Sequence, residues 1–367
     1  MIAAHPRVSN RVSGQTGLMG YRLIDLFSGA GGMSLGFHQE GVEPVLAIDN
    51  DAAAVETHRL NFGGEVHCGD IEAWLRTAEV PKADIVIGGP PCQGFSLLNK
   101  KRTGDLRRAL WEPYLEIAHR SEAKIFVMEN VAELYRSAEL LDIRAKAADY
   151  GFETRTQILN AADYGAPQTR KRTIVVGWRG VAEPDFPPRP THGEPGKGSN
   201  LPPWRTVRQM IADLPKPVGT EIGAVAPMNL HFGRTPTERS IARYKAVPLG
   251  GNRFDLQRNA PELTPDCWVR KTSGGTDLFG RLWWDRPSVT IRTEFFKPEK
   301  GRYLHPDQHR PITHREAARL MGFPDAFRFH GNKTDIARQI GNAVPPPLAA
   351  AIARMVVRML TPMKLSA

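Results

Sequence analysis

The sequence predicts an α/β fold: a parallel sheet with helices on both faces, joined to a smaller, irregular, β-rich domain. Three observations lead to this fold class. Short apolar runs alternate with amphipathic stretches through the first half of the chain. A Pro- and Gly-rich segment at 184–203 ends that alternation, and a clear helical pattern returns only after residue 311. Strands that alternate with helices are typical of a parallel sheet that is covered on both faces.

The expected strands are short, apolar and rich in β-branched residues. They are Tyr21–Phe27, Val45–Ile48, Ala83–Ile87, Lys124–Met128 and Thr173–Gly177. Helix-like segments lie between them, among them Ala52–Leu60 and Ala138–Tyr150. Ligands of open parallel sheets bind at the carboxyl ends of the strands, so we expect the functional side chains at that edge.

The rest of the chain divides at the proline-rich segment, because prolines cannot continue a helix or a central strand. We therefore expect a leader at 1–20, a first domain at 21–183, a second at 184–310, a hinge at 311–337 and a C-terminal segment at 338–367. Thr313–Met321 has the pattern of a helix with a capping box formed by Thr313 and Glu316. Another helix is expected over Pro346–Met359, after prolines that suit a first helical turn.

The chain is basic and has no hallmark of a secreted or membrane protein. Among its 367 residues, 49 Lys and Arg outnumber 39 Asp and Glu, a net charge of +10. Segment 181–310 carries 20 of the cations and 14 of the acids, which is +6 of that total. A basic balance favours a polyanionic partner. No apolar run approaches membrane-spanning length, and the first 20 residues lack the apolar core of a signal peptide.

The three cysteines are Cys68, Cys92 and Cys267, and they lie far apart without a CxxC pair. Neither a disulfide framework nor a metal site is expected from this spacing. A cytoplasmic location without a membrane partner fits these features.

A glycine-rich turn, Asp25–Gly32, follows the first expected strand and opens a helix. Glycines let the backbone approach a ligand, and a helix N-terminus presents free N–H groups. Asp49 ends the next strand and can accept hydrogen bonds from ribose hydroxyls, and Asp70-Ile71 follows a third strand. Each feature alone is explained by tight packing or helix capping. Together they favour an adenosine-containing ligand.

The segment Gly88–Ser96 (GGPPCQGFS) follows the strand ADIVI. A free cysteine is usually a small buried hydrophobe. Cys92, however, sits in a rigid Pro-Pro turn at the carboxyl end of a strand, where nearby cations or a helix N-terminus would raise its thiolate fraction. We therefore interpret Cys92 as a nucleophile.

Two further segments supply polar groups to the same edge. Glu129 ends the strand KIFVM and can act as a proton donor near the thiol, or simply cap a turn. Gln168, Arg170 and Arg172 alternate along an extended segment and are expected to share one face. Such a run of charged residues usually lies on a solvent-exposed surface. Here, however, three donors that point toward the same cleft as Cys92 and Glu129 suit an anionic or carbonyl-bearing substrate.

Taken together, the motifs resemble those of the bacterial DNA (cytosine-5)-methyltransferases, which use S-adenosylmethionine. The resemblance covers nearly the whole chain after the leader. The matching motifs, in order, are DLFSGAGG, AIDND, GDI, GGPPCQGFS, ENV, QTRKR, THREAARLMGFP and QIGNAVPPPLAAAI. It implies a Rossmann-like class I methyltransferase sheet in 21–183 and a target-recognition domain in 184–310, with the last helix returning to the sheet.

The resemblance also implies roles for particular residues. Cys92 would add to C6 of a flipped-out cytosine, Glu129 would contact N3 and Arg172 would contact O2. Arg170 would help to fix the catalytic loop and a phosphate. The expected cofactor-binding residues are Phe27, Ser28, Gly29, Gly31, Gly32, Asp49, Asn50, Asp70, Ile71, Pro91, Asn342, Ala343 and Val344. Asn50 departs from the family, which often has an apolar residue there.

Duplex DNA is the expected partner. The DNA-binding candidates are Gln93, Ser96, Lys100, Lys101, Arg102, Gln168, Arg234, Arg253 and Arg270. We expect a monomer that works beside a restriction endonuclease or alone. Two alternatives stay open: a tRNA cytosine-5 methyltransferase on the same fold, and a catalytically dead DNA-binding module. The basic segment argues against the first, and the presence of Cys92, Glu129 and Arg172 against the second.

Overall fold

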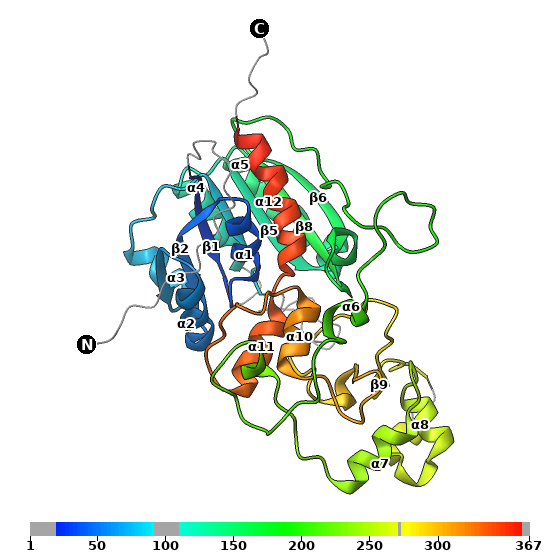
Figure 1. Ribbon diagram of the computed structural model, residues 1–367. Helices are drawn as coiled ribbons and strands as arrows, with labels where there is room; N and C mark the ends of the chain where they lie inside the picture. The colour runs from blue at the N-terminus through cyan, green and yellow to red at the C-terminus, as the bar shows by residue number, and fades with distance from the viewer. Residues whose placement is uncertain (1–19, 92–109, 271–272, 362–367) are drawn as a thin grey trace, which may run out of the picture.

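A seven-stranded sheet forms the centre of the molecule (Figure 1). The computed structural model describes residues 20–91, 110–270 and 273–361. The strand order is β3-β2-β1-β4-β5-β8-β6. The strands are β1 (Arg22–Leu26), β2 (Glu43–Asp49), β3 (Glu65–Cys68), β4 (Ile85–Gly88), β5 (Ile125–Val131), β6 (Glu153–Asn160) and β8 (Lys171–Trp178).

The sheet is mixed rather than purely parallel, which corrects the sequence prediction. β3, β2, β1, β4 and β5 pair in parallel, whereas β8 pairs antiparallel with both β5 and β6. β6 was not expected as a strand, because its alternating residues stay partly or fully exposed at the sheet edge. The antiparallel direction of β8 places its first residues beside the carboxyl end of β5, where Val131 pairs with Arg172.

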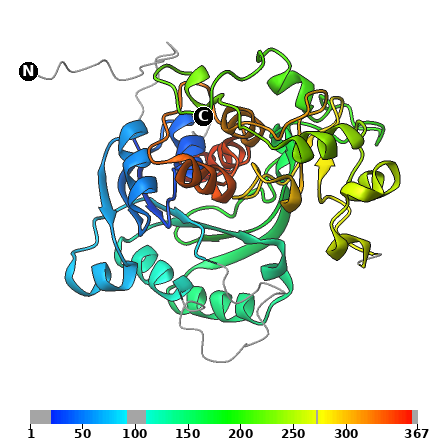
Figure 2. The same ribbon diagram turned by 90° about the horizontal axis from the view of Figure 1, so that it is seen from below.

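Helices cover both faces of this sheet, as predicted. They are α1 (Gly32–Gln39), α2 (Ala52–Asn61), α3 (Ile71–Thr77), α4 (Trp111–Arg120), α5 (Glu139–Asp149) and α12 (Pro346–Leu360). Apolar residues of α1 and α12 share a core with one face of the sheet. Those of α3, α4 and α5 share a second core with the opposite face. Figure 2 shows the red helix α12 on one side of the sheet and the cyan and green helices on the other.

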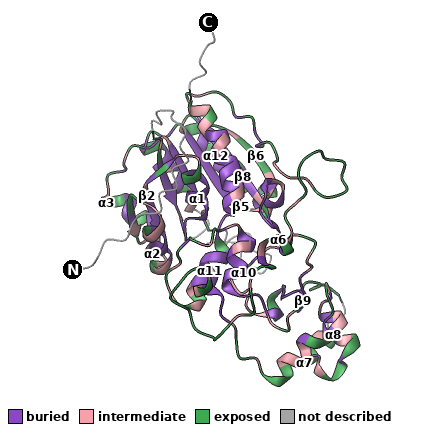
Figure 3. Cartoon of the chain, viewed as in Figure 1, coloured by how far each residue is buried: buried purple, intermediate pink, exposed green. Residues whose placement is uncertain are grey.

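The segment after β8 is irregular, as expected, but it contains more helix than strand. Its helices are α6 (Val207–Ile211), α7 (Glu238–Ala246), α8 (Arg253–Asn259) and α9 (Asp266–Val269), and its strands are β9 (Gly280–Arg281), β10 (Ser288–Val289) and β11 (Arg302–Leu304). It also has the short 3-10 helices η4 (Met228–Leu230), η5 (Pro261–Leu263) and η6 (Pro298–Lys300), whereas η2 (Ala132–Arg136) and η3 (Ala161–Tyr164) precede β8 in the sheet domain. Prolines and glycines interrupt this segment too often for long strands to form. Figure 3 shows its tip as mostly exposed or intermediate.

Buried arginines compensate for this lack of regular structure. The Arg281 guanidinium donates to the backbone carbonyls of Tyr244, Val247 and His305. Arg302 donates to the carbonyls of Gly250 and Arg281. Carbonyl groups that no ladder satisfies thus find charged donors, and irregular backbone can be buried at low cost.

Two helices connect the irregular segment to the sheet domain. They are α10 (His314–Met321), which has the predicted Thr313–Glu316 capping box, and α11 (Lys333–Asn342). With α6 they form a third apolar core. Within the described residues no single helix is long and apolar enough to cross a membrane, although α11 and α12, bent by 43° relative to each other, pass that test as a pair.

Candidate active site

The carboxyl ends of β1, β2, β4 and β5 meet at one edge of the sheet, and a tight turn leads from β1 into α1 there. Phe27 has a φ of 56° and Gly31 a φ of 83°, so the backbone turns through left-handed conformations. A Cβ atom on Gly32 would lie 2.5 Å from the Val344 carbonyl oxygen. The chain at 343–344 therefore lies directly against the first residue of α1. The cofactor contacts expected of Asn342, Ala343 and Val344 stay a prediction.

Asp49 is anchored beside this turn. Gly29 donates its backbone N–H to Oδ2 at 2.7 Å, and Asp51 donates its N–H to Oδ1 at 2.8 Å. Burial raises the pKa of the Asp49 carboxyl, and the nearby charge of Asp51 adds to the rise while the backbone donors oppose it. A carboxylate oxygen can accept more than one hydrogen bond, so both oxygens can still receive ligand hydroxyls.

Ser28 supplies an independent sign of a polar ligand at this edge. Its side chain is buried, and among the described residues its hydroxyl has no hydrogen-bond partner. Buried hydroxyls are normally paired. The unpaired Ser28 hydroxyl, the anchored Asp49 carboxylate and the glycine turn therefore fit a polar ligand that carries hydroxyl groups.

The other predicted cofactor residues have more varied surroundings. Asp70 is exposed and caps α3 by accepting the Ala73 N–H at 2.8 Å, whereas Ile71 behind it is buried. Asn50, Pro91 and Asn342 are exposed, and Asn342 ends α11. The cap explains Asp70 without a ligand, so its proposed contact with adenine stays a prediction.

Glu129 and Arg172 form an ion pair where β5 ends and β8 begins. Arg172 Nε lies 2.7 Å from Glu129 Oε1, and the side chains are 15% and 11% exposed. The turn after β4 lies against this pair, because a Cβ on Gly89 would be 2.9 Å from Glu129 Oε2. Asn130 donates its amide to the Pro90 carbonyl at 3.1 Å. The chain that leads into Cys92 is thus fixed next to the Glu129–Arg172 pair.

Gln168 and Arg170 do not join Arg172 in this site, which corrects the expectation of three donors on one open face. Arg170 is buried and donates to the carbonyls of Ile291 at 3.0 Å and Gly341 at 3.1 Å. Burial, together with the charge of Arg172, lowers the pKa of Arg170 to about 9. Gln168 lies in β7 (Gln168–Thr169), which pairs with β10. Both side chains hold the sheet domain to the later segments rather than facing solvent.

Residues 92–109 lie outside the part of the chain that the structure describes. They include the predicted nucleophile and most of the predicted DNA contacts: Cys92, Gln93, Ser96, Lys100, Lys101 and Arg102. The two described cysteines, Cys68 and Cys267, are exposed and free.

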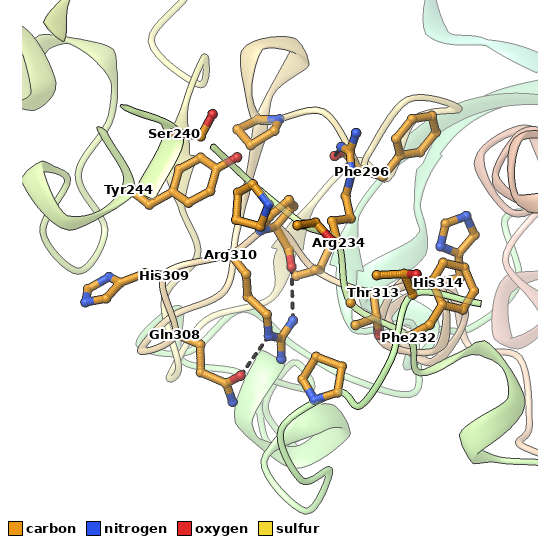
Figure 4. Close-up of a pocket in the computed structure, with 18 of the residues that line it drawn as sticks. Phe232, Arg234, Ser240, Tyr244, Phe296, Gln308, His309, Arg310, Thr313 and His314 are labelled. Carbon is orange, nitrogen blue, oxygen red and sulfur yellow. Dashed lines mark hydrogen bonds between the residues drawn. The ribbon is translucent and has the colours of Figure 1, made fainter. Parts of the chain in front are cut away.

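The three predicted recognition arginines differ in exposure. Arg253 is buried and donates to the carbonyls of Trp268 and Gly274, so it supports the fold instead of presenting its charge to DNA. Arg270 is exposed at the end of α9. Arg234 is exposed, lies over the Phe296 ring and lines an open cavity of about 1380 Å³ (Figure 4).

A buried chain of hydrogen-bonded polar side chains lies behind the glycine turn and was not predicted. Ser34 donates its hydroxyl to Asp25 Oδ2 at 2.6 Å, and His58 Nε2 lies 3.3 Å from the same hydroxyl. Burial raises the pKa of Asp25 to about 7 and lowers that of His58 to about 4. Asp25 opens the DLFSGAGG motif, but nothing in the sequence shows that its carboxyl faces α1 rather than the ligand edge.

Comparisons with known proteins agree with this geometry. The family model of the C-5 cytosine-specific DNA methylases matches residues 21–358. The Type II methyltransferase M1.HphI of Haemophilus parahaemolyticus is 35% identical over 355 residues, covering 94% of this chain and 88% of the relative. M.NgoFVII of Neisseria gonorrhoeae is 33% identical, with 92% and 86% covered.

This chain belongs to the C-5 cytosine-specific DNA methylases.

Solved structures show the same fold for this methylase. The crystal structure of a putative DNA modification methyltransferase encoded within an E. coli prophage superposes with a TM-score of 0.69 at 26% identity, covering 93% of this chain and 99% of that one. The S. pombe Dnmt2 methyltransferase shares the fold with a TM-score of 0.62 at 18% identity, covering 93% and 99%. The predicted α/β methyltransferase fold and cytosine-5 methylase activity are thus confirmed.

Proposed function

We propose that this methylase transfers a methyl group from S-adenosylmethionine to C5 of a flipped-out cytosine at a specific site in duplex DNA. The observation that carries the proposal is the buried Glu129–Arg172 pair beside the turn that leads into Cys92. A carboxyl group and a guanidinium held together can bind the N3 and O2 edge of a pyrimidine, since one can donate a proton while the other donates hydrogen bonds.

Cys92 would act as the nucleophile. C5 of cytosine is a poor nucleophile within an aromatic ring, so the thiolate first adds to C6 and makes C5 electron-rich. C5 then takes the methyl group, loses its proton, and expels the Cys92 thiolate as the C5–C6 double bond forms again. Glu129 would stabilise the adduct at N3, and Arg172 would hold O2.

The glycine turn, Ser28 and Asp49 would hold the cofactor, which supplies an electrophilic methyl group when bound. Asp49 would accept the ribose hydroxyls, and Phe27 would pack on the adenine. The close contact of Gly32 with Val344 would close one wall of this site.

DNA binding would depend on basic side chains outside the sheet. A stacked base cannot be attacked, so the target must leave the helix at a cost of a few kcal/mol, which protein contacts must offset. The loop at 92–109 and the exposed Arg234 and Arg270 supply cations for phosphate or base contacts. We propose a monomer acting in the cytoplasm, either beside a restriction endonuclease or alone.

Bisulfite sequencing of DNA from cells that express the chain tests this function. Wild type should protect the cytosines of one sequence motif, and Cys92→Ala should protect none. Purified Cys92→Ala should still bind S-adenosylhomocysteine, which shows that its cofactor site is intact. Protection by Cys92→Ala at the wild-type level, or transfer to tRNA as fast as to duplex DNA, would contradict the proposal.

A further inference from the structure

Helix α11 contacts the cofactor edge at two places. Its C-terminal end leads into the residues that press on Gly32. One turn earlier, Arg338 pairs with Asp51: Nε lies 2.8 Å and Nη2 2.7 Å from Oδ2. The first contact follows the end of α11 at Asn342, and the second is made by Arg338 within the helix. Helix α11 and the residues after it therefore contact both the β1–α1 turn and the β2–α2 turn.

Asp51 transmits this contact to Asp49. Its side chain caps α2 by accepting the N–H groups of Ala53 and Ala54. Its own backbone N–H donates to Asp49 Oδ1 at 2.8 Å. The orientation of the Asp49 carboxylate therefore depends on a residue that Arg338 fixes from another part of the fold.

Charge gives Arg338 a second effect. The charged groups that interact with Asp49 are Asp25 on β1 and Asp51 before α2. Asp51 pairs with Arg338 of α11, which also pairs with Asp335 of the same helix. Cys68 lies opposite Asp49 on β3. The charge of Asp51 raises the pKa of Asp49, and the charge of Asp49 in turn raises the pKa of Asp25. Arg338 offsets the charge of Asp51.

We propose that Arg338 is a positioning residue for the cofactor: by holding and neutralising Asp51, it keeps the Asp49 carboxylate oriented toward the ribose hydroxyls. This inference rests on the proposed function, since it requires the cofactor at this edge. The ion pairs of Arg338 are with Asp51 and Asp335, so its proposed effect on Asp49 acts through Asp51.

The chain offers a matched control pair. Arg354 of α12 pairs with Glu40 at 2.7 Å, and these side chains are 41% and 25% exposed. For Arg338 and Asp51 the distance is also 2.7 Å, and the exposed fractions are 42% and 23%. Both pairs join a C-terminal helix to the sheet domain, but the Arg354–Glu40 pair lies at the far end of α1.

The test measures the Kd of S-adenosylhomocysteine by calorimetry, at pH 6 and pH 8, for wild type, Arg338→Gln and Arg354→Gln. Arg338→Gln should bind about tenfold more weakly, which is about 1.4 kcal/mol. The loss should be larger at pH 6, because an unneutralised Asp51 raises the pKa of Asp49 further and more of the carboxyl is protonated. Arg354→Gln should bind like wild type.

A rescue variant separates positioning from general loss of structure. Arg338→Gln/Asp51→Asn keeps the helix cap, because asparagine caps as well as aspartate, but removes the uncompensated charge. It should recover most of the affinity at pH 6. With saturating cofactor, kcat of Arg338→Gln should stay near the wild-type value.

Two results would overturn the inference: equal affinity of Arg338→Gln and Arg354→Gln, or an Arg338→Gln defect that is independent of pH and not rescued by Asp51→Asn. Failure of the folded wild type to bind S-adenosylhomocysteine would instead contradict the proposed function. Asp49→Asn distinguishes these cases, because it should weaken binding if the cofactor site is correct.

Discussion

Arg172 Nε lies 2.7 Å from Glu129 Oε1, although the two residues are 43 positions apart in the sequence. The antiparallel pairing of β8 with β5 explains this contact. Val131 pairs with Arg172, and Glu129 lies two residues away on the same face of β5. A diagonal neighbour at this separation is within reach of a long side chain. Had β8 run parallel to β5, its first residue would lie at the opposite edge of the sheet.

Arg172→Ala should lower the rate of methyl transfer by about 10²-fold or more, since a positioned donor at the reacting base is lost. Cofactor affinity should change little. Single-turnover methylation of a duplex containing the target site measures the effect. Arg155→Ala is the control, because Arg155 of the edge strand β6 forms an exposed ion pair with Glu183, which follows β8. Equal losses in the two variants would contradict a role at the base.

Arg170→Met should destabilise the protein by about 2–4 kcal/mol, because the Ile291 and Gly341 carbonyls lose a buried charged donor. Urea unfolding measures this. The salt dependence of DNA binding should keep the wild-type slope, as Arg170 faces the interior and not a phosphate. A shallower slope in Arg170→Met would show that Arg170 contacts DNA after all.

Asp25→Asn should change how stability depends on pH. The folded pKa of Asp25, about 7, lies above its ordinary value of 3.8, so the folded state binds the extra proton between these values. The contribution of Asp25 to stability is therefore present at low pH and is lost as pH rises through 7. Between pH 5 and pH 8, wild type should lose about 2–3 kcal/mol relative to Asp25→Asn.

Urea unfolding of both proteins at the two pH values measures that difference. The pKa of His58 is lowered to about 4, so its contribution to the free energy of unfolding increases with pH. This contribution is the same in both proteins and cancels in the comparison. Parallel pH profiles of wild type and Asp25→Asn would show that Asp25 is ionised at neutral pH in the folded protein.

Asp70→Asn distinguishes a ligand contact from a helix cap. Asparagine keeps the cap on α3, so the free energy of unfolding should stay within about 0.5 kcal/mol of the wild-type value. A carboxylate that accepts the adenine amine should, when replaced, weaken S-adenosylhomocysteine binding about three- to tenfold. Unchanged affinity would assign Asp70 to capping alone.

Much of the sheet domain could be predicted because its strands are continuous apolar runs. Five expected strands correspond to β1, β2, β4, β5 and β8, and the capping box of α10 is found as expected. β6 escaped prediction, since an edge strand with an exposed face shows no apolar run. The direction of β8 escaped it too, because strand direction depends on the connection through β6 and not on the strand's own residues.

The candidate site was predicted where side chains follow directly from strand ends, as for Asp49 and Glu129. The prediction was wrong where alternation along the sequence was the only reason to place side chains on one face of a strand. Gln168, Arg170 and Arg172 alternate, but β7 ends at Thr169 and β8 begins at Lys171, so the three do not share one continuous strand. Arg253 was misjudged for another reason: a long cationic side chain can satisfy buried carbonyls, which composition does not reveal.

Covalent trapping tests the central claim most directly. A target duplex with 5-fluorocytosine carries no removable proton at C5, so the methylated adduct cannot release its thiolate. With S-adenosylmethionine, wild type should form a stable protein–DNA complex whose crosslinked peptide contains Cys92, and Cys92→Ala should form none. An enzyme that methylates the ordinary duplex but leaves the fluorinated duplex free, or attaches it elsewhere than Cys92, would contradict the account.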